Sequence, residues 1–265
     1  MSQAAKRIAA LPQPIIHHIH LPGIVPYQRA ATLQDYLVKK HLTAKQPANR
    51  ALPPPPPYLI TAEFAPVYTC GRREVGHVSQ SQQDYLRWGG RAAFVEAQRG
   101  GQTTFHGPGQ LIVYPILDLQ RHALTPKCYV NMLEEVTIAT LAHYHIKGTR
   151  TENTGVWTSA DHKIASIGVH MRRNVTSHGV GINFYTDLGF FDRIVACGLE
   201  GKRTVSVEKF GIRTEDGVGA GVEGPGTIWM WEFGKRLRGA GGEAVGGMRV
   251  GWREVERLLV EAGAV

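Results

Sequence analysis

Apolar residues recur along the chain at two spacings, one typical of helices and one typical of strands. Apolar positions at helical spacing predict a first helix from Thr32 to about Lys45, with Thr32 and Asp35 near its start. A second predicted helix begins at Thr125-Pro126, where proline fits the first turn, and continues to His145. The same spacing returns near the C-terminus, over residues 228–237 and 252–259.

Segments rich in aliphatic and aromatic residues predict the strands. They cover residues 58–68, 92–97, 111–119, 155–158, 164–170 and 179–184. Strands mixed with a few helices in one chain indicate an α/β or α+β domain, with a mixed sheet packed against helices.

Proline and glycine divide the chain into parts. The run Pro53–Pro57 cannot continue a helix and predicts a stiff connector within an insertion over residues 47–57. Beyond residue 211 two glycine-rich stretches predict linkers around a helical extension. We therefore expect a tail over residues 1–15, one large domain over 16–210, and a C-terminal extension of that domain over 211–265.

Composition narrows the class of protein. The chain has 265 residues, is 43% hydrophobic, and contains no apolar run long enough to span a bilayer. Three cysteines without CxxC spacing favour a reducing compartment over a disulfide framework or a zinc site. The net charge of +8 favours acidic partners. The first 34 residues lack acidic side chains, which is typical of a mitochondrial transit segment but also of a short frayed tail.

The most informative run covers residues 99–119, "RGGQTTFHGPGQLIVYPILDL". Four glycines remove side chains where the backbone would pass close to a ligand, so the run predicts a pocket wall. Arg99 either neutralises an anion or holds this loop by hydrogen bonds, and His106 either lines the site or donates a hydrogen bond. A purely structural hairpin is the alternative.

The second informative run contains Lys163 and Cys197. Lys163 opens an apolar strand after a turn, where partial desolvation favours the neutral amine that can act as a base. Cys197 precedes Gly198 in a predicted loop, where a thiol can reach a pocket, and a nearby cation would favour its thiolate. A small buried hydrophobe is the alternative for Cys197, as it is for Cys70 and Cys128.

A third candidate cluster, His17, His18 and His20, does not predict a metal site. Adjacent side chains on a strand point to opposite faces, so the three histidines do not converge.

Four blocks of this sequence resemble the lipoyl(octanoyl) transferases, within the biotin and lipoate protein ligase group. The family pattern RGG-x-x-T-[YF]-HGPGQ matches Arg99–Gln110, K-[IV]-x-[SA]-[IL]-G matches Lys163–Gly168, and HG-x-x-[LI]-N matches His178–Asn183. P-C-G matches Ala196–Gly198, with alanine in place of proline. The blocks occur in the family's order, and the resemblance extends from about residue 16 to residue 207.

The resemblance implies a biotin/lipoate protein ligase-like catalytic domain and an acyl transfer reaction. Octanoyl would pass from acyl carrier protein to a lysine of a lipoyl domain or of glycine cleavage H protein through a thioester on Cys197, with Lys163 favouring the thiolate. It implies no cofactor, metal, nucleic acid or membrane, a monomer, and a mitochondrial or, in bacteria, cytoplasmic location. The implied substrate-binding residues are Arg99, Gly100, Gly101, Gln102, Thr103, Thr104, Phe105, His106, Ser166, Ile167, Gly168, Gly179, Val180 and Gly181.

Two other functions stay open at the level of sequence. An ATP-dependent lipoate or biotin protein ligase would share the fold and the strand lysine but would need no cysteine, so Cys197 favours the transferase. A basic nucleic-acid-binding module would account for the charge, but the chain lacks the interleaved aromatic and basic residues of a base-stacking surface.

Overall fold

A computed structural model describes residues 15–49, 51–194, 201–212, 222–239 and 242–265. Within these residues a large mixed sheet has the strand order β10-β8-β9-β6-β2-β1-β11, with β7 added beside β8. Its strands are β1 (Ile16–Val25), β2 (Tyr58–Phe64), β6 (Gln110–Ile116), β7 (Val156–Trp157), β8 (His162–Arg172), β9 (Val175–Asn183), β10 (Arg203–Thr204) and β11 (Gly247–Arg249). The predicted mixed sheet with helices is confirmed.

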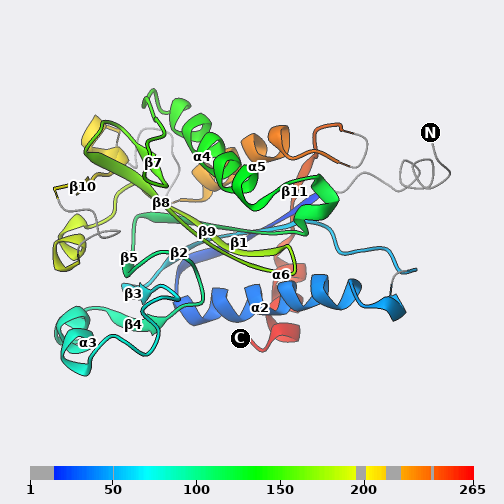
Figure 1. Ribbon diagram of the computed structural model, residues 1–265, viewed down its shortest axis with the longest axis horizontal. Coiled ribbons are helices and arrows are strands. Elements are labelled where there is room, and N and C mark those ends of the chain that lie inside the picture. The colour runs from blue at the N-terminus through cyan, green and yellow to red at the C-terminus, as the bar shows by residue number, and fades with distance from the viewer. Residues whose placement is uncertain (1–14, 50, 195–200, 213–221, 240–241) are drawn as a thin grey trace.

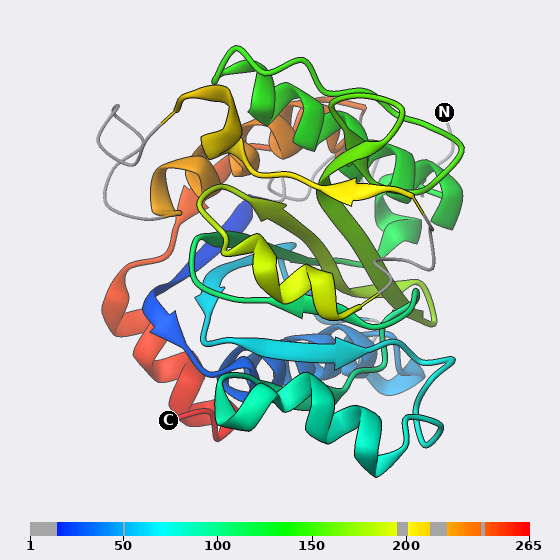
Figure 2. The ribbon, with the colours of Figure 1, turned by 90° about the vertical axis from the view of Figure 1, so that its left-hand side faces the viewer.

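Helices cover both faces of this sheet (Figure 1). Helices α4 (Pro126–Ala142) and α5 (Glu223–Arg236) lie on one face, and α2 (Tyr27–Ala44) and α6 (Trp252–Ala262) lie on the other. A small second sheet, β4-β3-β5, lies beside the large one together with helix α3 (Gln80–Arg87), as Figure 2 also shows. Its strands are β3 (Val67–Cys70), β4 (Ala93–Glu96) and β5 (Thr104–His106).

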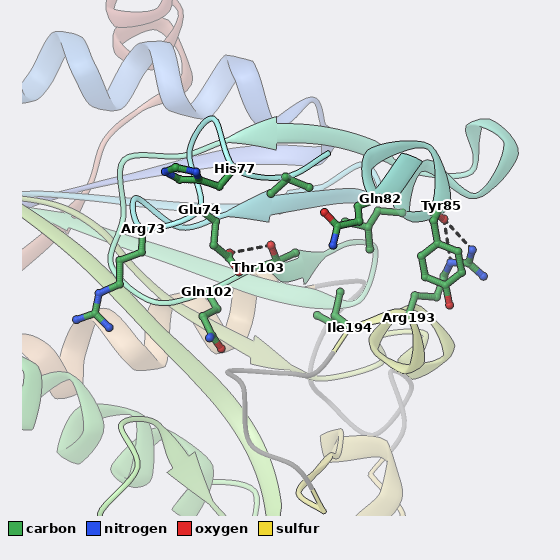
Figure 3. Close-up of a pocket in the computed structure, with 11 residues that line it drawn as sticks. Arg73, Glu74, His77, Gln82, Tyr85, Gln102, Thr103, Arg193 and Ile194 are labelled. Carbon is green, nitrogen blue, oxygen red and sulfur yellow. Dashed lines mark hydrogen bonds between the residues drawn. The ribbon is translucent and has the colours of Figure 1, made fainter. Parts of the chain in front are cut away.

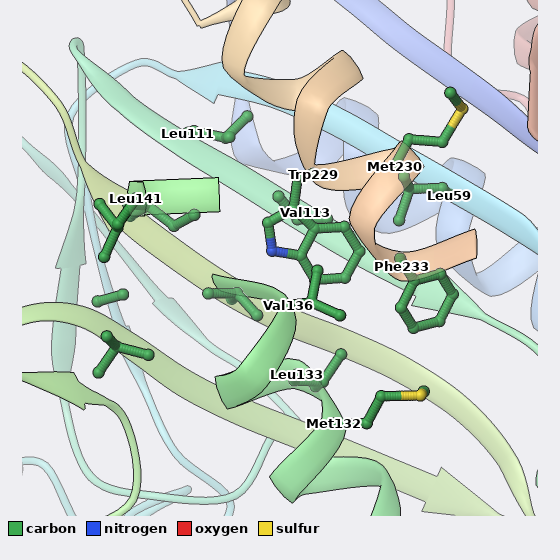
Figure 4. Packing of buried hydrophobic residues seen from close by; sticks show 14 of the residues in the cluster. Leu59, Leu111, Val113, Met132, Leu133, Val136, Leu141, Trp229, Met230 and Phe233 are labelled. Carbon is green, nitrogen blue, oxygen red and sulfur yellow. The ribbon is translucent and has the colours of Figure 1, made fainter. Parts of the chain in front are cut away.

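The face under α4 and α5 contains the larger apolar core. Trp229 and Phe233 of α5 stack with ring centroids 5.1 Å apart and pack against Leu133 and Val136 of α4 (Figure 4). The indole Nε1 of Trp229 donates to Thr137 Oγ1 at 3.1 Å, so the buried polar end of this ring is satisfied. This packing fixes α4 against the sheet strands that lead to the candidate site.

Three predictions about local structure need correction. Helix α2 begins at Tyr27, five residues before Thr32, because Pro26 supplies the extended turn that precedes it. The strand predicted over 58–68 is two strands in different sheets, since the chain turns at Ala65-Pro66. The linker prediction is wrong for residues 223–226, which form the first turn of α5 with Pro225 buried.

The C-terminal part of the chain packs into the domain. Strand β11 pairs in parallel with β1, and Val255, Leu258 and Leu259 of α6 lie in the core beneath α2. Within the described residues no helix is long and apolar enough to cross a membrane.

Six of the described histidines are buried, and in four of them burial lowers the pKa to about 4 or below. Burial lowers the pKa of His18 and His178 to about 3, and that of His41 and His106 to about 4, from the ordinary value of 6.5. The imidazoles are therefore neutral in the folded protein near pH 6, where the unfolded chain already binds protons.

We predict that the protein loses stability as the pH falls from about 6.5 toward 4, because protons then favour the unfolded chain. Each histidine contributes a slope of at most about 1.4 kcal/mol per pH unit. Urea unfolding at a series of pH values measures this slope, and His41→Asn should make it shallower. A free energy of unfolding that stays constant or rises as the pH falls over this range would contradict the prediction.

Candidate functional site

Three of the segments singled out in the sequence meet at one place. Strands β8 and β9 are antiparallel neighbours, and their register pairs Ser166 with Gly181 and Gly168 with Gly179. The loop that begins at Arg99 is attached to the same strands, since the Gly100 amide donates to the Val169 carbonyl at 3.0 Å. The predicted substrate-binding residues, separated by up to 82 positions in sequence, therefore form one cluster.

Arg99 holds its own loop. Its guanidinium is buried and donates to Thr69 Oγ1 at 2.8 and 3.1 Å, and to the carbonyls of Gly100 and Gln102 at 3.0 and 2.9 Å. Of the two roles predicted for Arg99, the structure shows the hydrogen-bonded one. Thr69, on β3, is a partner that sequence reasoning missed.

A series of hydrogen bonds links the motif blocks of the site. His106 Nδ1 lies 2.6 Å from Gln110 Oε1, and Gln110 Nε2 donates to Asn183 Oδ1 at 2.8 Å. Asn183 Nδ2 in turn donates to the Val205 carbonyl at 3.2 Å, and the Val205 amide donates to the Lys163 carbonyl at 2.8 Å. Because an amide oxygen can only accept, His106 carries its proton on Nδ1 and donates, which was one of its two predicted roles.

The glycines of these blocks make room for neighbouring protein atoms. A Cβ added at Gly168 would lie 3.1 Å from both Arg99 Cδ and the Gly100 carbonyl oxygen, and one at Gly181 would lie 3.1 Å from Gln110 Oε1. The sequence interpretation, that glycines leave space for a ligand, is therefore incomplete: at these positions the space is filled by the protein's own side chains and backbone.

The predicted binding residues differ in exposure. Thr104, Phe105, His106 and the segment 179–181 are buried, whereas Gly100, Gly101 and Gln102 are exposed and Ser166 to Gly168 are half-buried. The accessible members are the ones that could touch a substrate, and the buried members support them. Glu63, whose carboxylate accepts the Gly109 amide at 2.7 Å, is a further support that the sequence did not indicate.

Lys163 is the second residue of β8 and is only 6% exposed. Strand β7 pairs on one side of it and β10 on the other, through Trp157 and Thr204. Its Nζ lies 5.3 Å from the centroid of the Trp157 ring. The sequence placed Lys163 at the start of a strand but gave no sign of this aromatic neighbour.

A pocket of about 470 Å³ opens beside the Arg99 loop (Figure 3). Gln102 and Thr103 line it together with residues of α3 and with Ile194, the last described residue before 195–200. Thr103 Oγ1 donates to Glu74 Oε2 at 2.9 Å, and Arg193 donates through Nε and Nη2 to the Tyr85 carbonyl. The walls are part polar and part apolar, with Val78, Leu86 and Ile194 on the apolar side.

The cysteines have separate environments. Cys197 lies outside the described residues. Cys70 is fully buried, and burial raises the pKa of its thiol, whereas Cys128 is exposed on α4. Neither belongs to the cluster around β8 and β9.

The histidines of β1 do not form a metal site with their neighbours. His18 Nε2 and His20 Nδ1 both contact Thr61 Oγ1, at 2.7 and 3.0 Å, on one face of the strand. No group of three or more His, Cys, Asp or Glu side chains that could hold a metal occurs among the residues that the structure describes.

Comparison with known proteins shows the family of this chain. Residues 26–215 match the model of the lipoyl protein ligase A/B catalytic domain. A relative from Schizosaccharomyces pombe, named "Probable octanoyltransferase", is 47% identical over 72% of this chain and 84% of its own length. A Danio rerio relative, named as the mitochondrial octanoyl-[acyl-carrier-protein]:protein N-octanoyltransferase LIPT2, is 37% identical over 72% of this chain and 80% of its own.

Solved structures agree on the fold. Lipoate-protein ligase A bound with ATP superposes with a TM-score of 0.61 at 12% identity, covering 94% of each chain. The bipartite lipoate protein ligase of Thermoplasma acidophilum gives a TM-score of 0.62 at 13% identity, covering 95% of this chain and 92% of its own. This chain belongs to the lipoyl protein ligase A/B catalytic domain family and, within it, to the octanoyltransferases.

Proposed function

We propose that this octanoyltransferase moves the octanoyl group through a thioester on Cys197, with Lys163 transferring the protons. The observation that carries the proposal is the placement of Lys163. It is buried at the start of β8 and paired with Thr204, and Cys197 lies in sequence between Ile194, which lines the pocket, and Thr204. Lys163 thus pairs with a strand that begins six residues after Cys197 in the sequence.

In the first half-reaction the Cys197 thiolate attacks the octanoyl carbonyl of the donor. The bond to the phosphopantetheine sulfur breaks as the bond to Cys197 forms, so one thioester replaces another and the free energy changes little. Lys163 accepts the proton of the Cys197 thiol and returns it to the departing pantetheine sulfur. The exchange needs no ATP.

In the second half-reaction the acceptor lysine attacks the Cys197 thioester. Its amine loses a proton to Lys163, an amide forms, and Cys197 leaves as the thiolate. Because the amide is more stable than the thioester, this step drives the cycle forward. Lys163 therefore acts in both half-reactions.

The donor and acceptors follow from the family. We infer that the donor is octanoyl-acyl carrier protein and that the acceptors are lipoyl domains or glycine cleavage H protein. The name of the Danio rerio relative supports the donor. In this proposal the exposed residues Gly100–Gln102 and the half-buried residues Thr103 and Ser166–Gly168 contact the acyl group. The protein acts as a monomer and, in a eukaryotic cell, in mitochondria.

A basic surface extends from the pocket toward the end of β8. Arg72, Arg73, Arg172 and Arg173 are exposed, and Arg172 and Arg173 line a second hollow with Lys39 and His170. Burial lowers the pKa of His170, and the charges of Arg72 and Arg172 lower it further. The positive charges of Arg72 and Arg172 thus both lie close enough to His170 to lower its pKa. We propose that this surface attracts an acidic carrier protein.

We predict that Cys197→Ser lowers octanoyl transfer by about 1,000-fold or more, because a serine hydroxyl is not ionised at neutral pH. An intact mass spectrum after incubation with octanoyl-carrier protein should show an octanoyl adduct on the unchanged protein and none on the variant. Cys128→Ser, at an exposed position on α4, is the matched control and should remain active. Near-normal transfer by Cys197→Ser would overturn the thioester mechanism.

We predict that Lys163→Ala slows both half-reactions by about 100- to 10,000-fold, the usual contribution of a positioned acid–base group. It should also raise the pH at which Cys197 reacts with an alkylating reagent, since a group that stabilises the thiolate is lost. Lys202→Ala is the control, because Lys202 pairs with Asp161 in the exposed turn before β8. An alkylation profile identical to that of the unchanged protein would show that Lys163 and Cys197 are not coupled.

We predict that salt slows the reaction with the carrier protein more than the reaction with a small neutral octanoyl thioester. Charges steer encounter over about 8 Å at physiological ionic strength, and only the carrier is charged. The measurement is kcat/KM for both donors at low and high salt. The double substitution Arg172→Glu with Arg173→Glu should weaken use of the carrier alone, while Arg253→Glu on α6 should have little effect. Equal salt sensitivity of the two donors would disprove steering.

A further inference from the structure

The loop between α4 and β8 confines the side chain of Lys163. The fully buried ring of Trp157 lies with its centroid 5.3 Å from Nζ. Gly155, two residues earlier in the same loop, also lies against Lys163, and its φ of +130° favours glycine. A Cβ added at Gly155 would lie 2.4 Å from Lys163 Cε and 3.0 Å from Nζ. The direction in which the amine points is thus limited by the backbone at Gly155.

The backbone amide of Gly155 donates a hydrogen bond to a buried carboxylate. Glu134, on α4, is 4% exposed, and its Oε1 accepts the Gly155 amide at 3.0 Å. Its Oε2 accepts from Arg150 Nε at 2.8 Å. A carboxylate buried in a core is costly unless it has such partners, so the three groups are held as a unit.

The part of the loop around Trp157 is held by hydrogen bonds within the loop. Trp157 Nε1 donates to the Asn153 carbonyl at 3.0 Å, and Thr149 and Trp157 exchange backbone hydrogen bonds of 2.7 and 3.0 Å. The ring that faces Lys163 and the glycine that limits it are therefore parts of one short loop. Glu134 connects both Gly155 and Arg150 of this loop to α4.

We propose that Glu134 is a positioning residue for the acyl transfer. By holding Gly155 and Arg150, it fixes the wall beside Lys163 and with it the direction of the amine. The inference rests on the proposed role of Lys163 as the proton-transferring group. It adds a residue from a helix on the far side of the loop, distant in sequence from all four motif blocks.

The test compares Glu134→Ala with Glu135→Ala. Glu135 is the adjacent residue on α4, is about half exposed, and also pairs with Arg150, through Nη1 at 3.2 Å, so it controls for loss of charge and for loss of the Arg150 contact. With a small octanoyl thioester as donor, Glu134→Ala should lower kcat by about 10- to 100-fold, the effect of misplacing a catalytic group by about 1 Å. Glu135→Ala should change kcat by less than about twofold.

Two further readouts separate positioning from general support of the fold. Glu134→Ala should raise the pH at which Cys197 is alkylated, in the direction seen for Lys163→Ala. In a Lys163→Ala background, Glu134→Ala should lower kcat by less than about twofold more, because its effect acts through the lysine. A full further loss in that background, or an unchanged alkylation profile, would overturn the proposal.

The outcomes also distinguish this proposal from the proposed function. If Lys163→Ala is as active as the unchanged protein, the proposed function fails and this inference with it. If Lys163→Ala is impaired while Glu134→Ala behaves like Glu135→Ala, only this inference fails. Should Glu134→Ala not fold, Glu134→Gln and Trp157→Phe serve in its place. The first weakens the Arg150 contact and the second removes the bond to Asn153, and kcat values equal to that of the unchanged protein for both would overturn the proposal.

Discussion

The site depends on one series of hydrogen bonds that runs from the side chain of His106 to the backbone of Lys163. Gln110 on β6 and Asn183 on β9 are its central members, and each has its amide satisfied on both sides. A buried amide that lost a partner would leave an unpaired polar group in the core, which costs about 1–3 kcal/mol. This series of hydrogen bonds therefore fixes the relative positions of β6, β9 and β10. Through Val205 it also fixes the backbone of Lys163.

Around these hydrogen bonds, the site is built by close approach of backbone segments. The Arg99 loop lies against β8 because Gly168 has no side chain, and β9 accepts Gln110 beside it because Gly181 has none. The conformation of the loop is held by the guanidinium of Arg99, which bonds to Thr69 of the small sheet. The exposed part of the loop is thus presented to solvent on a hydrogen-bonded support, which suits the substrate-binding role proposed for it.

The same fold serves ligases that bind ATP and the transferases to which this chain belongs, so the fold by itself does not select the reaction. In the mechanism that we propose, a few groups select the reaction. A lysine on β8 suits any reaction at an acyl carbon, whereas a cysteine in the segment that follows allows the acyl group to be carried as a thioester. The basic surface around Arg72 and Arg172, in the same proposal, favours a charged protein donor over a small neutral one.

The sequence by itself determined the family, the mixed fold and the residues of the four blocks, because spacing and residue type are local properties that the chain displays directly. It also identified α4 from Thr125-Pro126, since a capped amphipathic helix needs little tertiary help. The periodic pattern missed the start of α2, which Pro26 sets. It also missed the packing of residues 223–226, where burial outweighed local preference. Only the tertiary structure decided the environment of Lys163. Glu134, Gly155 and Trp157 come together through helix packing and a bulged strand pairing, and contacts between residues so far apart in sequence leave no periodic signal in it.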